Sequence, residues 1–350
     1  MVRHIAFAVP GSLDTPTGGY AYDRRLIEEL RKLGWQVDVV DLGEGFPWPT
    51  DRTRALAWQR LSEVPPGRAM IIDGLAYGVL PEAVLQLRVD NPLIALVHHP
   101  LALESGLSPQ QVNILGSCER AALTAARLVI ANSEETARHL TRDYGVTAQR
   151  IVIARPGSDS APMAQGSRDR IVRLISVGAL VPRKGFDVLI AALATLSDLP
   201  WRLTIVGDRT RDPATATRVE NDIARRGLDD RIEVLGAVST ERLDRLYTEA
   251  DLFVLASRFE GYGMAYSEAL AHGLPIVGTK AGAIPETVPA DAGVLVAPDD
   301  VAALSGALRR LIEQPDERQK LATAARAAAA RLPTWLDTAA IVARALEGLA

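Results

Sequence analysis

The sequence SRFEGYGMAYSEALAHGLPIVGTKAGAIPE, residues 257–286, combines a turn, a helix and the start of a strand. The apolar run DLFVLA at 251–256 precedes it and is typical of a buried parallel strand. Gly261 and Gly263 predict a turn, and a helical pattern follows over 264–272. Gly273 and Pro275 end this helix, because glycine favours the position after a helix and proline cannot continue one. We therefore expect a strand–loop–helix–strand unit.

This unit predicts an anion-binding site. The start of a helix at the carboxyl edge of a sheet offers free N–H groups and a positive dipole end, which suit phosphate. Glu260 and Glu268 lie eight residues apart in the same unit. A carboxylate repels phosphate, so both need another partner, and sugar hydroxyls can donate hydrogen bonds to them. The alternative is that both are exposed residues of a turn and a helix.

The pattern S-x-F-E-G-Y-G-x-x-x-x-E-A-L-A-x-G-x-P-I-V over 257–277 resembles the signature of retaining GT-B glycosyltransferases, family 4 (glycosyl transferases group 1). The resemblance covers nearly all of the C-terminal half and is looser in the N-terminal half. It implies an α/β protein of GT-B architecture, with two Rossmann-like domains facing an interdomain cleft. It also implies metal-independent transfer of a hexose from a nucleoside-diphosphate sugar to an acceptor hydroxyl, with retention of anomeric configuration.

Composition limits the possible functions. A length of 350 residues favours two domains. The formal net charge of -4, without a basic block, argues against nucleic acid as a partner. Cys118 is the only cysteine, which excludes an internal disulfide and fits a reducing cytoplasm. The N-terminal apolar run is too short for a signal peptide, and no segment reaches the roughly 18 apolar residues of a membrane span. We expect a cytoplasmic protein with at most weak peripheral membrane contact.

Short apolar runs alternate with helical patterns in both halves, which predicts two parallel sheets with helices on their faces. The expected strands are 5–9, 37–42, 69–72, 93–97, 128–131 and 151–154, then 172–177, 202–206, 232–235, 252–256, 275–278 and 293–297. The segment 158–170 is rich in proline, glycine, serine and charge and predicts a linker. The first domain is then 1–157, together with a final helix at about 335–350, and the second is 171–334. The resemblance implies that this final helix packs on the first domain.

Three residues of the first half are candidate ligand contacts. Gly18 and Gly19 begin a predicted helix, where backbone N–H groups can approach a phosphate or the acceptor; a simple turn and helix cap is the alternative. His98 directly follows the strand 93–97, at the edge where open α/β sheets bind ligands, although it could also be a loop residue bonded to the backbone. The resemblance implies that the glycines face the donor diphosphate. It also implies that His98, rather than His99, is the family's histidine in this domain.

Two adjacent cations follow the first strand of the second half. Arg183 and Lys184 stand at a strand end that opens onto a helix, which suits a diphosphate; two solvated turn residues are the alternative. Lysine is rare in this chain, so Lys184 is the more informative of the two. The family usually carries another cation where this chain has Ala179, and Arg183 is a candidate substitute from another direction.

The resemblance assigns further roles. Glu260, His98 and Lys184 are the expected catalytic residues: Glu260 orients the sugar, and Lys184 stabilises the leaving diphosphate. Glu268 accepts ribose hydroxyls, and Gly236 and Val238 follow a strand in the loop that contacts the base. The complete expected donor-binding set is Arg183, Glu268, Gly261, Tyr262, Gly263, Met264, Gly18, Gly19, Gly236 and Val238.

We expect no cofactor and no metal, with UDP or GDP as the nucleotide of the donor. The acceptor loops leave a small alcohol, a saccharide and a lipid-linked molecule open as acceptors. A sugar-nucleotide epimerase, a phosphorylase and a non-catalytic nucleotide-sugar-binding protein are the alternatives. An epimerase would turn over without an acceptor, and a binding protein would not turn over at all.

Overall fold

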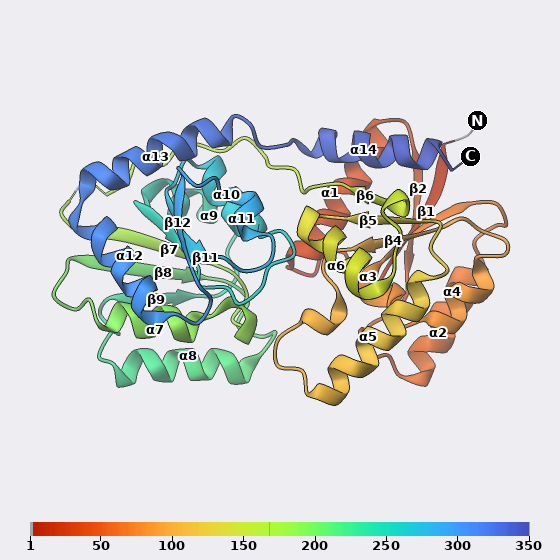
Figure 1. Ribbon diagram of the computed structural model, residues 1–350, viewed down its shortest axis with the longest axis horizontal. Coiled ribbons are helices and arrows are strands. Elements are labelled where there is room, and N and C mark those ends of the chain that lie inside the picture. Colours follow the sequence, from red (N-terminus) through yellow and green to blue (C-terminus); the bar gives the residue numbers. More distant parts are fainter. Residues whose placement is uncertain (1–2, 168, 350) are drawn as a thin grey trace. The chain divides into compact units, whose positions relative to one another are not determined.

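The computed structural model describes residues 3–167 and 169–349. It divides into two compact units, Met1–Gly157 with Pro333–Ala350 and Ser158–Leu332. Each unit contains a six-stranded parallel sheet covered by helices, so the predicted α/β fold class with two Rossmann-like domains is confirmed (Figure 1). In the described part of the chain, no helix is both long and apolar enough to cross a membrane.

The first unit has the strand order β2-β1-β3-β4-β5-β6. Its strands are β1 (His4–Val9), β2 (Gln36–Asp41), β3 (Ala69–Asp73), β4 (Leu93–Val97), β5 (Leu128–Ala131) and β6 (Ile151–Ile153). The order reverses between β1 and β3, so the connections leave these two neighbours in opposite directions. Their carboxyl ends therefore form the crevice in which doubly wound sheets bind ligands.

Local sequence defines the helices of the first unit. Thr17 caps α1 by accepting a hydrogen bond from the Tyr20 N–H, and Ser133 caps α6 in the same way from Thr136. Ser108 and Gln111 form a capping box at the start of α5. The helices are α1 (Gly18–Lys32), α2 (Asp51–Ser62), α3 (Gly74–Tyr77), α4 (Pro81–Leu87), α5 (Pro109–Leu123), α6 (Glu134–Tyr144) and α14 (Trp335–Glu347).

The second unit has the order β12-β11-β10-β7-β8-β9, which reverses between β7 and β10. Its strands are β7 (Val172–Val177), β8 (Trp201–Val206), β9 (Ile232–Leu235), β10 (Leu252–Val254), β11 (Ile276–Thr279) and β12 (Gly293–Val296). Its helices are α7 (Phe186–Ala194), α8 (Pro213–Arg225), α9 (Thr240–Glu249), α10 (Met264–Ala271), α11 (Ile284–Thr287), α12 (Val301–Glu313) and α13 (Pro315–Ala329). This is the strand order of dinucleotide-binding folds, so β7 and β10 flank the expected ligand crevice.

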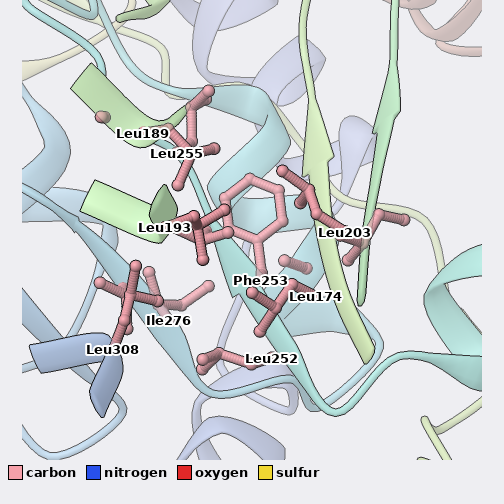
Figure 2. Packing of buried hydrophobic residues seen from close by; sticks show 14 of the residues in the cluster. Leu174, Leu189, Leu193, Leu203, Leu252, Phe253, Leu255, Ile276 and Leu308 are labelled. Carbon is pink, nitrogen blue, oxygen red and sulfur yellow. The ribbon is translucent and has the colours of Figure 1, made fainter. Parts of the chain in front are cut away.

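The core of the second unit centres on β10. Figure 2 shows the ring of Phe253 among leucine side chains that include Leu193 of α7 and Leu203 of β8. Both faces of a parallel sheet are covered, so its strands are apolar along their whole length and β10 is fully buried. This packing fixes the strand end from which the candidate site residues project.

Residues 162–165, within the predicted linker, are hydrogen-bonded to the second unit. The Ala164 N–H donates to the His272 carbonyl over 2.7 Å, and the Gln165 N–H donates to the Thr248 carbonyl over 2.9 Å. His272 Nδ1 also lies 2.8 Å from the Pro162 carbonyl oxygen. Residues 162–165 are therefore an ordered edge of this unit.

Helix α14 packs against α1, although the two lie at opposite ends of the chain (Figure 1). Trp335 begins α14 and is 5% exposed. Its ring contacts Tyr22 edge-on with 5.7 Å between ring centroids, and the Arg25 guanidinium lies 5.6 Å from its centroid. A Cβ atom on Gly157 would collide with the Trp335 backbone, so the close approach requires glycine there.

We predict that Trp335→Ala lowers the stability of the first unit by about 3 kcal/mol, or roughly 6–12 °C in melting temperature, because a buried indole leaves a large cavity. Differential scanning calorimetry measures the change. Leu336→Ala is the matched control, since Leu336 is 50% exposed on the same helix. Equal melting temperatures for the two variants would contradict the anchoring role of Trp335.

Candidate active site

Two loops of the second unit are bonded together where its strand order reverses. The loop after β7 includes the short helix η3 (Pro182–Lys184), and the loop after β10 includes Arg258 and Glu260. The Arg258 N–H donates to the Arg183 carbonyl over 2.7 Å, and the Arg258 guanidinium donates to the Pro182 carbonyl over 2.6 Å. The same guanidinium pairs with Asp187 and with Asp299. Arg258 thus fixes both loops in one arrangement.

Glu260 is buried between the two expected phosphate-binding cations. Lys184 Nζ lies 2.6 Å from one carboxylate oxygen, and Arg183 Nη1 lies 3.0 Å from the other. Ser257 Oγ donates a third hydrogen bond over 2.7 Å. Burial alone would raise the pKa of Glu260, but Lys184 and then Arg183 lower it to about 2. Glu260 is therefore a permanent carboxylate, which excludes the alternative of an exposed turn residue.

The N-terminus of α10 offers open backbone donors beside this cluster. Gly263 has φ +89°, a conformation that L side chains rarely adopt, and it directs the chain into the helix. The N–H groups of Met264 and Ala265 have no acceptor among the described residues. Gly261 and Tyr262 precede them and are buried. Two N–H groups without an acceptor at a helix start are the kind of donors that an anion can accept from, and anion binding here stays a prediction.

Glu268 lies on the same helix in a different environment. It is half-buried and accepts a hydrogen bond from the Tyr247 hydroxyl over 3.2 Å. Burial raises the pKa of Glu268 to about 7. The Tyr247 ring is stacked on His272 with 4.6 Å between centroids, which fixes the position of its hydroxyl. A carboxyl group of this kind can exchange hydrogen bonds with hydroxyls in either protonation state.

The remaining expected donor contacts of this unit lie at the same sheet edge. Gly236 and Val238 follow β9 and are half-buried. Ala179 follows the glycine after β7 and provides no side-chain charge. Of the cations in the loops after β7 and β10, Arg258 is held by Asp187 and Asp299, so Arg183 and Lys184 remain the candidates for contact with an anion.

In the first unit, His98 is bonded to two buried carboxylates. Its Nε2 lies 3.1 Å from Asp23 Oδ1 and 3.2 Å from Asp73 Oδ2. Asp23 is fully buried on α1, and Asp73 ends β3 and caps α3 through the Leu75 N–H. Ligand atoms of the three residues lie within 4.8 Å of one another, close enough to hold a metal ion. Both nitrogen–oxygen distances are those of hydrogen bonds, however, and we interpret the group as an ion-pair cluster.

The start of α1 contacts the His98 ring. A Cβ atom on Gly19 would lie 3.1 Å from His98 Cδ2, so glycine allows the ring to approach the helix closely. Gly18 is the first residue of this helix. Tyr22 meets the ring edge-on with 5.2 Å between centroids. His99 points to a different partner, Glu104, at 3.5 Å. The structure thus brings His98 and Gly19 together and leaves His99 apart from this cluster.

Sequence analysis missed four residues of these sites: Asp23, Asp73, Ser257 and Tyr247. Asp73 carried a usable signal, since a carboxylate at the end of a predicted strand lies at the ligand edge of the sheet. Asp23 and Tyr247 lie within helices, and their partners are 75 and 21 residues away. Local sequence carries no signal for such contacts.

The sequence matches two glycosyltransferase families. Residues 162–328 match the family described as "Glycosyl transferases group 1", and residues 18–161 match "Glycosyltransferase Family 4". The chain is 29% identical to "MMP alpha-(1->4)-mannosyltransferase" of Mycolicibacterium hassiacum, over 71% of this chain and 63% of that protein. It is 34% identical to a "D-inositol 3-phosphate glycosyltransferase" of Nocardiopsis dassonvillei, over 66% of this chain and 58% of that protein. The match spans less than two thirds of these relatives' length.

Solved glycosyltransferase structures share the fold. Sucrose-phosphate synthase of Thermosynechococcus elongatus superposes with a TM-score of 0.82 at 21% identity, covering 99% of each chain. HepE of Anabaena, solved with UDP-glucose, gives 0.79 at 21% identity and covers 98% of this chain and 99% of its own. Together with the two family matches, which extend over residues 18–328, these similarities show that the chain belongs to the GT-B glycosyltransferases of group 1.

Proposed function

We propose that this protein transfers a hexose from a nucleoside-diphosphate sugar to an acceptor hydroxyl, with retention and without a metal ion. The observation that carries the proposal is the arrangement in the second unit. Lys184, Arg183 and the open N–H groups of α10 offer positive charge at the sheet edge that carries Glu260 and Glu268. A sugar nucleotide has the matching chemistry, since it joins a diphosphate to two sets of hydroxyls.

The charge of the cluster favours a diphosphate. Two cations contact the carboxylate of Glu260, so this group of three side chains contains one more positive than negative charge. Transfer places additional negative charge on the leaving diphosphate, and fixed positive groups stabilise that charge without reorganising. Lys184 and Arg183 are assigned this role, together with the N–H groups of Met264 and Ala265.

The two glutamates are assigned to the sugars. Glu268 accepts the ribose hydroxyls, and Glu260 orients the transferred sugar through its hydroxyls. Glu260 is not assigned as a nucleophile, because three hydrogen bonds, two of them from cations, hold its oxygens. The leaving phosphate would instead help to remove the acceptor proton on the same face, which gives retention. Gly18, Gly19 and His98 are assigned to contacts with the reacting substrates, and Gly236 and Val238 to the base.

UDP or GDP is the proposed nucleotide of the donor. HepE, a structural neighbour, was solved with UDP and with UDP-glucose. The acceptor is a small alcohol, a saccharide or a lipid-linked molecule. The printed names of the relatives include an inositol phosphate glycosyltransferase and a mannosylfructose-phosphate synthase, so small hydroxylated acceptors are the first to screen.

We predict that one nucleotide among UDP, GDP and ADP, alone or as its glucose or mannose conjugate, raises the melting temperature. At 100 times its dissociation constant, a ligand adds about 2.7 kcal/mol of stability.

Lys184→Ala should weaken this nucleotide's binding roughly 30-fold, or about 2 kcal/mol, because a charge-assisted hydrogen bond is lost. Glu268→Ala should also weaken it. Lys320→Ala, an exposed change on α13, is the control. Equal affinities for Lys184→Ala and this control would refute the phosphate assignment.

We predict that Glu260→Ala reduces turnover more than nucleotide affinity, because Glu260 is assigned to the transferred sugar. Initial rates of nucleotide release with acceptor measure turnover, and proton NMR of the product reads the anomeric configuration. Glu260→Gln keeps the shape of the side chain, and Glu249→Ala at an exposed position is the control. An unchanged rate would remove Glu260 from the mechanism. An epimerised sugar nucleotide formed without any acceptor, read by the same NMR measurement, would favour an epimerase, and an absence of turnover with any acceptor would favour a binding protein.

A further inference from the structure

The cluster of His98, Asp23 and Asp73 brings two carboxylates into contact with one histidine nitrogen. Asp23 is fully buried and Asp73 is 4% exposed, and both contact the same nitrogen. Two buried carboxylates side by side cannot both stay ionised without a compensating positive charge. Asp23 and Asp73 are the titratable groups that shift His98, and Tyr22, which touches its ring, is a buried phenol. The protonated ring of His98 can supply this charge, since its Nε2 lies within hydrogen-bond distance of both carboxylates.

The orientation of the His98 ring allows it to contact both carboxylates at once. Nε2 faces the two carboxylates, so its proton is shared between Asp23 and Asp73. Gly19 and Tyr22 contact the ring and restrict its rotation. Nδ1 has no hydrogen-bond partner among the described residues, and the His98 side chain is 18% exposed. A protonated His98 therefore presents a second N–H group outward.

We propose that Asp23 and Asp73 are positioning residues that hold His98 as a protonated, outward-facing hydrogen-bond donor. His98 then takes part in the reaction as a fixed cation that binds an oxygen atom of the substrate, and not as a general base. This inference rests on the proposed function, in which His98 contacts the reacting substrates. It agrees with a mechanism in which the leaving phosphate, rather than a side chain, receives the acceptor proton.

The charge balance supports this arrangement. Burial alone would lower the pKa of His98, but Asp23 and Asp73 together raise it to about 10. Burial and then the neighbouring Asp73 raise the pKa of Asp23 to about 7. His98 thus stays charged at neutral pH, and Asp23 is the carboxyl that takes up a proton when pH falls. Removal of either carboxylate should lower the pKa of His98, since each stabilises the charged ring.

The test is a nitrogen-15 NMR titration of the five histidines in the free protein. His98→Gln assigns the His98 signal. In the wild type, this signal should show a protonated ring throughout the range from pH 6 to about 9. In Asp23→Asn and in Asp73→Asn, the pKa should fall by at least about one unit, which is a tenfold change in the ionisation constant. The amide oxygen introduced by Asp73→Asn can still cap α3, and Asp23→Asn gives a second variant that leaves this cap untouched.

A matched control removes a carboxylate from another histidine of the same unit. Asp143 contacts His139 at 3.0 Å on the exposed face of α6. Asp143→Asn should leave the His98 signal unchanged. Once a donor and an acceptor are known, the transfer rate of the Asp23→Asn variant should fall with rising pH about tenfold per unit above the new pKa of His98. The wild-type rate should not fall over the same pH range.

Three outcomes would overturn the proposal. His98 could be neutral at pH 7 in the wild type, or its pKa could be the same in both aspartate variants as in the wild type. A Zn²⁺ or Mn²⁺ ion, added alone, could raise the melting temperature of the wild type but not of His98→Gln, which would make the cluster a metal site. The titration uses neither donor nor acceptor, so it stands even if glycosyl transfer is not found.

Discussion

The buried carboxylate of Glu260 is the interaction on which the second unit's site depends. It lies between Lys184 and Arg183, which come from the loop after β7, while Glu260 itself follows β10. These are the two strands at which the sheet reverses its order, so one ion cluster connects both sides of the crevice. Removal of Glu260 would leave Lys184 and Arg183 without their shared carboxylate, which costs more than the ion pairs themselves contribute. The cluster therefore holds the loops in place, and its two cations are those that we propose to bind the diphosphate.

Each unit contains a buried ion cluster, and the two clusters have opposite ratios of cations to carboxylates. Each places a buried ion cluster at the carboxyl edge of its sheet. In the first unit, Asp73 ends β3, one of the two strands where the order reverses, and His98 follows the neighbouring β4. In the second unit, two cations surround one carboxylate, and the surplus suits a diphosphate. In the first unit, two carboxylates surround one histidine, and the histidine is the only cation of the cluster. A histidine held in this way can donate a hydrogen bond but cannot accept a proton.

Sequence analysis predicted the strands because parallel strands, buried on both faces, read as continuous apolar runs. It predicted Glu260, Glu268, Lys184 and His98 as site candidates because each follows a strand or belongs to one local motif. It did not predict that Lys184 binds Glu260, because the two are 76 residues apart and meet only when β7 and β10 pair. Asp23 was not predicted either, because its partner His98 is also far away in the sequence. Its position is decided by how α1 packs over the sheet, which no short pattern records.

Glu260 and Glu268 show why a motif alone does not assign roles. They stand eight residues apart in one strand–loop–helix unit, yet their surroundings shift their pKa values in opposite directions, to about 2 and about 7. Glu260 has two cations within hydrogen-bond distance, whereas Glu268 has a tyrosine hydroxyl. A pair of carboxylates separated in this way can divide two tasks, since one keeps its charge and the other changes protonation near neutral pH. The charged member holds Lys184 and Arg183 in place and suits hydrogen bonds from the hydroxyls of the transferred sugar. The other suits hydrogen bonds to hydroxyls that must form and break as the nucleotide enters and leaves.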